Sequence, residues 1–166
     1  MKKLIYIIFI FIISSNTYAN DNYYIDIDYI LNNSNLGKLI VNKLNNVNKN
    51  NLTDFKQKEI ELKNLEKEIS NKKNVVSEKD LNIEIDDLKR KILLFREEKN
   101  KRSKDFKDLR SNELSNFLEK ITPIIENFMK ENSIAIVFEK KNIFIAQSKY
   151  DITLQIIDLI NKQFDD

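Results

Sequence analysis

The sequence predicts an α+β protein, mostly α, in which a long antiparallel helical-hairpin (coiled-coil) arm projects from a small β body that assembles as an oligomer. Three observations lead to this prediction. The chain has 33% charged residues but one Gly and one Pro, a balance typical of long helices. A seven-residue apolar repeat runs through its middle. Two short runs rich in Ile, Val and Phe follow near its end.

Residues 1–19 are typical of a secretory signal peptide. Two lysines precede an uninterrupted apolar run over 4–13, and the small residues Thr17 and Ala19 define a cleavage site after Ala19. The alternative is an uncleaved membrane anchor, although a spanning helix needs roughly twenty apolar residues. We therefore expect the chain to be exported and the signal peptide to be cleaved.

The composition excludes several classes of function. Of 28 basic and 26 acidic residues, only Lys2 and Lys3 leave with the signal, so the mature chain carries 26 of each and shows no nucleic-acid signature. There is no His and no Cys, which removes most zinc sites, cysteine nucleophiles and the usual general base. One Gly cannot build a phosphate-binding loop. We expect no enzyme activity, no metal, no cofactor and no nucleic-acid partner.

Residues 20–34 are predicted to form the first strand and a short helical turn of the body. Ile25 and Ile27 alternate with Asp26 and Asp28, the pattern of a half-buried strand. Ser34 is the predicted N-cap of the helix that follows.

Residues 35–122 are predicted to form the arm, with a turn near 70–80. The first helix has one seam position that is mainly apolar and a second that is weak. These positions are Val41, Asn48, Phe55, Leu62, Ile69 and Val76, and then Leu44, Asn51, Lys58, Leu65 and Lys72.

The second helix begins after a predicted cap at Ser77 and has a seam that is apolar at both ends. Its seam residues are Leu81, Ile85, Leu88, Ile92, Phe95, Lys99, Arg102, Phe106, Leu109 and Glu113. Lys99 and Arg102 should weaken the packing between the two helices in the middle of the arm, which would make the arm bendable there. The pattern then continues, after a shift of register, through Phe117, Ile121, Ile124 and Phe128. Long helices joined by a short turn run antiparallel, giving arms of roughly 60–75 Å.

Pro123 lies where the arm approaches the body. Inside a helix it would remove one hydrogen bond and kink the axis. Alternatively a new helix begins here, with Thr122 as N-cap and Pro123 at the first helical position.

Residues 123–166 are predicted to hold the end of the arm, a β-hairpin and a C-terminal helix. The strands 134–139 and 143–147 are apolar on both faces, and Asp151 should cap a helix with Ile152, Ile156, Leu159 and Ile160 inside. So few strands cannot cover such faces within one chain, which predicts oligomerisation through them. The candidate oligomerisation residues are Ile25, Ile27, Ile134, Ile136, Phe138, Ile143 and Ile145.

A basic segment runs along the second helix of the arm. Between Lys89 and Arg110, ten basic residues accompany four acids. A solvated helix face is one explanation, and a wall that attracts acidic chains or anionic lipid headgroups is the other. The candidate client-binding residues are Lys89, Arg90, Arg96, Lys99, Arg102 and Lys104.

The ordered set of elements resembles the Skp/OmpH family of periplasmic chaperones over essentially the whole mature chain. Its pieces are "YIDIDYILNNSNLGK" (24–38), "TPIIENFMKENSIAIVFEK" (122–140) and "YDITLQIIDLIN" (150–161). The residues that match the family pattern are Asp26, Ser34, Gly37, Lys38, Pro123, Asp151, Ile152 and Thr153. One departure is Asn35, where the family often has Pro.

This resemblance implies a periplasmic homotrimer whose arms surround a cavity and hold unfolded outer-membrane proteins without ATP. Such a holdase prevents aggregation and aids delivery to the outer membrane. An anionic lipid surface is a further candidate partner. The alternative is a periplasmic coiled-coil spacer or adaptor, or a signal-anchored structural protein, without chaperone activity.

Overall fold

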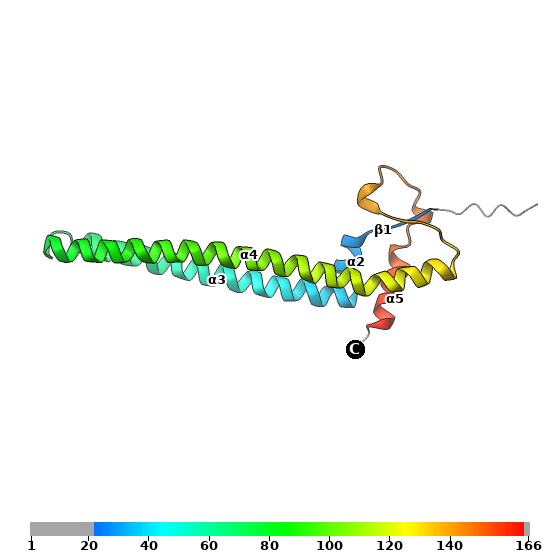
Figure 1. The fold of residues 1–166 in the computed structure, drawn as a ribbon, viewed down its shortest axis with the longest axis horizontal. Helices are drawn as coiled ribbons and strands as arrows, with labels where there is room; N and C mark the ends of the chain where they lie inside the picture. Colours follow the sequence, from blue (N-terminus) through cyan, green and yellow to red (C-terminus); the bar gives the residue numbers. More distant parts are fainter. Residues whose placement is uncertain (1–21, 165–166) are drawn as a thin grey trace, which may run out of the picture.

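A computed structural model describes residues 22–164, and the predicted signal peptide lies outside them. Figure 1 shows a long two-helix arm, made of α3 (Asn35–Lys72) and α4 (Glu78–Glu131), extending from a small head. The head contains β1 (Tyr23–Ile25), α2 (Ile27–Asn33), β2 (Val137–Glu139) and α5 (Thr153–Gln163). Within the described residues, none of the helices is long and apolar enough to span a bilayer.

The two arm helices begin at the predicted caps. The Ser34 Oγ accepts a hydrogen bond from the Gly37 N–H (3.1 Å), and the Ser77 Oγ accepts one from the Asp80 N–H (3.2 Å). Both oxygens satisfy first-turn donors that have no partner within the helix. The turn is tighter than predicted and occupies only 73–77, because the polar residues before it continue α3. At about 1.5 Å per residue, α3 is about 57 Å long.

The predicted seam largely matches the burial along the arm. Phe55, Ile69 and Leu88 are buried, whereas Asn48 is exposed and Val47 is half-buried. The predicted seam is therefore wrong at this one position, where burying an apolar valine is favoured over burying an amide, whereas Val41 and Leu44 are half-buried as predicted.

Pro123 lies inside α4, which continues to Glu131, so the alternative in which a new helix begins here is wrong. The Thr122 hydroxyl donates to the Leu118 carbonyl (2.7 Å) instead of capping a helix. The expected boundary between 122 and 123 thus falls within one continuous helix.

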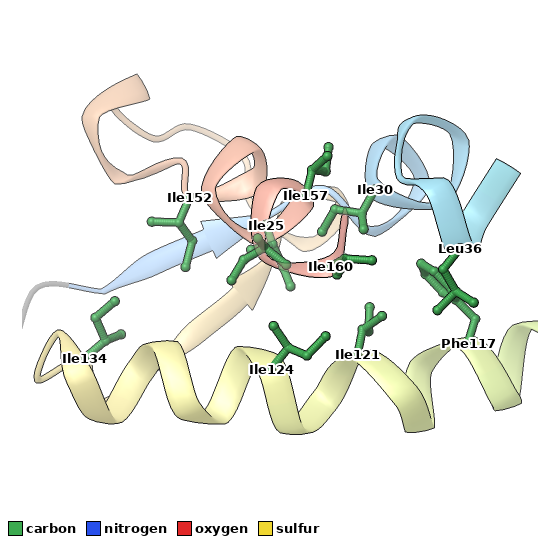
Figure 2. Close-up of a cluster of buried hydrophobic side chains, with 11 residues drawn as sticks. Ile25, Ile30, Leu36, Phe117, Ile121, Ile124, Ile134, Ile152, Ile157 and Ile160 are labelled. Atoms are coloured by element: carbon green, nitrogen blue, oxygen red, sulfur yellow. The ribbon is translucent and has the colours of Figure 1, made fainter. Parts of the chain in front are cut away.

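The hydrophobic core lies where α4 passes under the head (Figure 2). Ile121 and Ile124 of α4 point toward α5, and Phe117 of α4 lies beside the start of α3. The helix α5 contributes Ile156 and Ile160. Four of these five side chains have no exposed surface, and Ile124 has 6%. The predicted shift of register at Phe117 is confirmed, because Phe117, Ile121 and Ile124 are all buried in this core.

The head does not contain the predicted β-hairpin. Instead, β2 pairs in parallel with β1, with Tyr24 opposite Phe138, and a 3₁₀ turn (Lys140–Asn142) follows. Residues 143–147 form no strand within the described chain. The connecting residues Lys-Lys-Asn lack the glycine that tight hairpin turns favour, so the chain continues without reversing onto β2.

The start of the body is also shorter than predicted. The strand ends at Ile25, and the Asp26 carboxylate caps α2 by accepting from the Tyr29 N–H (2.9 Å). Ile27 is therefore the first residue of a helix, not part of a strand.

Two pieces of the family pattern, around Asp26 and Thr153, meet in space although they lie at opposite ends of the chain. The Asp26 N–H donates to the buried Thr153 Oγ1 (2.9 Å), and the Ile152 N–H donates to the Tyr24 carbonyl (3.1 Å). Asp151 accepts from the Thr153 N–H (3.0 Å), which gives it the predicted capping role, although the N-cap position itself is Ile152. These bonds fasten β1 to the start of α5.

Candidate functional site

The candidate oligomerisation residues divide into two groups. Ile25 and Ile134 are buried in the core of the single chain, and Ile27 packs against it. In the single chain these three side chains pack mainly within the head, and their contact with other copies stays a prediction. Ile136 and Phe138 are 48% and 45% exposed and Ile145 is 83% exposed, while Ile143 is half-buried.

Phe144 is the exposed apolar residue that the sequence reasoning missed. Its side chain is as exposed as in an isolated residue (103%). Alternation along a 143–147 strand places Ile143 and Ile145 on one face and Phe144 on the other. Because the segment is not a strand, alternation did not decide which side chain is exposed.

Part of the candidate basic wall is neutralised by acids on the same helix. Lys89 contacts Asp86 (Nζ to Oδ1, 3.0 Å), and Arg90 and Lys91 contact Asp87. The Lys91 ammonium and then the Arg90 guanidinium hold the pKa of the Asp87 carboxyl below its usual value. Exposed pairs of this kind contribute little stability, but they reduce the positive charge available to a ligand.

A second part of the wall joins the two helices at mid-arm, in a group that we call the mid-arm clasp (Asp54, Phe55, Lys58, Glu59, Phe95, Glu98, Lys99 and Arg102). Lys99 Nζ lies 3.0 Å from Glu59 Oε1, and Arg102 lies 2.9 Å from Asp54 Oδ2. Lys58 pairs with Glu98 across the same seam.

Aromatic rings complete the mid-arm clasp. Phe55 and Phe95 meet edge to face at 6.1 Å, with the Arg102 guanidinium 5.2 Å from the Phe55 ring centre. Cations over ring faces add to the attraction between the helices. Cross-helix contacts therefore hold the two helices together in the middle of the arm, and the expectation of weak packing there is wrong.

Arg96 and Lys104 are the members of the candidate wall that remain unpaired in the described part of the chain. Lys101, Lys107 and Arg110 of the same helix also lack an ion-pair partner there. The neighbouring stretch of α3, from its start to Asp54, contains no acid and instead carries lysines and asparagines. This unpaired positive charge of α4 thus lies between Arg96 and Arg110, within the predicted basic segment.

A shallow cavity of about 330 Å³ opens on the side of the arm. It is lined by Leu62, Leu65, Leu94 and Phe95, with charged residues at its rim. Leu94 is more than half exposed, as are Leu39, Leu52 and Leu93 elsewhere on the arm. The arm therefore combines apolar side chains with unpaired cations.

One ion pair near the head links the start of α2 to the turn after β2. Lys140 Nζ lies 3.0 Å from Asp26 Oδ2. The Tyr29 N–H and then the Lys140 ammonium hold the pKa of the Asp26 carboxyl below its usual value. The same hydrogen bond raises the pKa of Lys140. This pair lies at the surface and has a structural role.

Within residues 22–164, no cluster of three or more His, Cys, Asp or Glu side chains could hold a metal ion.

Comparisons with known proteins agree with this architecture. The family model described as outer membrane protein (OmpH-like) matches residues 23–160. The crystal structure of a candidate outer membrane chaperone (OmpH-like) from Caulobacter crescentus superposes with a TM-score of 0.77 at 15% identity. The match covers 86% of this chain and 85% of that one, and at this identity it shows the fold alone. None of the curated proteins matches the chain.

The family match supports a chaperone-type function. It spans both arm helices and the head, including the Asp26–Thr153 junction. The chain belongs to the OmpH-like family of outer membrane proteins.

Proposed function

We propose that the protein is an ATP-independent periplasmic holdase that binds unfolded outer-membrane proteins between its arms and aids their delivery to the outer membrane. The observation that carries this proposal is the arm itself. Its two helices project beyond the head core and expose leucines and unpaired cations along their length. An unfolded chain offers apolar and charged groups without a fixed shape, and such a mixed surface suits it.

The charge of the arm would act mainly in the first encounter. Unpaired cations such as Arg96 and Lys104 attract acidic segments at long range, and this attraction falls with ionic strength. Leucines and the shallow mid-arm cavity then retain apolar segments at short range. Holding a chain by equilibrium binding needs no ATP and no reaction site.

Assembly as a homotrimer is part of the proposal. The apolar side chains left exposed on the head, among them Ile136 and Phe138, would be covered by other copies. Several heads joined in this way would place their arms around a shared space. Export with cleavage after Ala19 would deliver the chain to the periplasm, through which its clients pass. An anionic lipid surface is a proposed second partner for the unpaired cations.

The test is the turbidity of an outer-membrane protein diluted from denaturant, with and without the mature chain (residues 20–166). We expect suppression at one trimer per client. A charge-reversed pair, Arg96→Glu with Lys104→Glu, should weaken suppression at low salt. The matched control reverses Lys89 and Arg90, which already pair with acids, and should have a smaller effect. Absence of suppression by the unmodified trimer would contradict the proposal.

A spacer or adaptor is the second candidate, and the mid-arm clasp favours it because cross-helix contacts stiffen the arm. A spacer would have one defined partner and no affinity for unfolded chains. The same turbidity assay separates the two functions.

A further inference from the structure

The segment 143–147 carries the most exposed apolar side chains of the described head. It connects two 3₁₀ turns, Lys140–Asn142 and Ser148–Tyr150, and Figure 1 draws it within a loop (orange) that stands away from α4. Phe144 is fully exposed and Ile145 is 83% exposed. Large aromatic side chains are the residues that most often anchor protein interfaces.

An apolar pocket of about 410 Å³ lies beside this segment. Its walls include Tyr23, Tyr24, Phe138 and Tyr150. The rings of Tyr23 and Tyr150 meet edge to face at 5.7 Å, which fixes one wall in place. The pocket therefore offers aromatic surface with a defined shape.

Phe144 does not occupy this pocket in its own chain, because the side chain is fully exposed although its neighbours Ile143 and Ala146 line the pocket. One copy thus displays an aromatic side chain and an aromatic pocket that it does not bring together. Two copies can bring them together.

We propose that Phe144 of one copy occupies the pocket of the next copy. This inference rests on the assembly in the proposed function and identifies the side chain that anchors the contact between copies. Because the donor and acceptor surfaces differ, the contact is head to tail, and such contacts repeat until a ring closes. A symmetric pair of Phe144 side chains would instead stop at two copies.

The exposed area is of the size that such a contact needs. Phe144, Ile145, Ile136 and Phe138 together expose on the order of 500 Å², taking about 200 Å² for a fully exposed large side chain. A stable interface covers about 800 Å² on each partner, so this patch supplies more than half of it. Phe138 also lines the pocket, which makes the patch and the pocket one continuous surface.

The test is the native mass of the mature chain with one element removed at a time. Phe144→Ser removes the anchor, and Ala146→Trp fills the pocket. Each variant should require at least about tenfold more protein to assemble. A one-to-one mixture should form a two-chain species, because the intact Phe144 of one variant enters the intact pocket of the other. Val75→Ser, at the arm tip and equally exposed as Ile145, should leave the mass unchanged.

A covalent test uses the absence of native cysteines. Phe144→Cys combined with Asn22→Cys at the pocket rim should give a ladder of crosslinked chains under oxidation. Each cysteine alone should give none. Crosslinking by Phe144→Cys alone, or normal assembly of Phe144→Ser, would overturn the inference. Turbidity is measured separately. If the Phe144→Ser variant still forms a trimer that suppresses aggregation, the role of Phe144 in assembly is refuted, but the proposed holdase function is not.

Discussion

The head and the arm are held together by different forces. The head has a contiguous core with fully buried side chains from α2, α4 and α5. In the arm beyond Phe117, the buried side chains are Phe55, Ile69 and Leu88, and much of the cross-helix contact is ionic. The head should therefore unfold as a cooperative unit, whereas the arm should open locally at lower free energy.

The largest expected effect comes from truncating the same residue type in the two regions. Phe117→Ala should lower the free energy of unfolding by about 3–5 kcal/mol, because Phe117 has no exposed surface and the core around it cannot collapse fully. Phe55→Ala should lower it by about 2 kcal/mol, since the arm relaxes more easily. Urea unfolding followed by circular dichroism gives both values. Equal losses would show that arm and head unfold as one unit.

The next effect concerns the junction between the two regions. A Cβ placed on Gly37 would lie 2.0 Å from the Leu31 carbonyl oxygen, so α2 and α3 would have to move apart. Gly37→Ala should therefore destabilise the head by about 1–3 kcal/mol, although alanine favours helix. Asn46→Ala, on the exposed surface of α3, is the control and should be neutral or slightly stabilising. A Gly37→Ala melting temperature at or above that of the unmodified chain would refute this account of the junction.

A smaller effect is expected at the mid-arm clasp. Arg102→Met removes the contacts with Asp54, Glu98 and the Phe55 ring and should cost about 1 kcal/mol at low salt. Arg96→Met, at a cation without an ion pair in the described chain, is the matched control. Hydrogen exchange of arm amides should accelerate in the first variant only, and the difference should shrink in 1 M salt. Identical exchange in both variants would mean that the ion pairs do not hold the helices together.

The smallest effect is the pH dependence of the head. The lowered pKa of Asp26 means that its carboxylate stabilises the fold above the usual carboxyl pKa, and that this contribution disappears as the pH falls through the lower folded value. Asp26→Asn keeps a capping side chain but removes the charge. The melting temperatures of the two chains should differ at pH 7 and converge as the pH falls below the lowered pKa of Asp26. A difference that stays constant with pH would assign the effect to something other than ionisation.

The arm could be predicted from the sequence because its signals are local. Ser34 and Ser77 cap the helices as expected, and the shift of register at Phe117 was visible as a change of apolar spacing. The partners of Lys99 and Arg102 could not be predicted. They lie on the other helix, and which acids they meet depends on the exact alignment of the two helices across the turn.

The two arm helices, their serine caps and the apolar residues available for a core follow from the sequence alone. Three features depend on the folded arrangement: β1 and β2 pair in parallel, Asp26 meets Thr153, and Ile134 is buried while Phe144 is exposed. These two groups of features differ in how far apart along the chain the interacting residues lie. Helix periodicity depends on residues three or four apart, whereas strand pairing and the division between core and surface depend on segments more than a hundred residues apart.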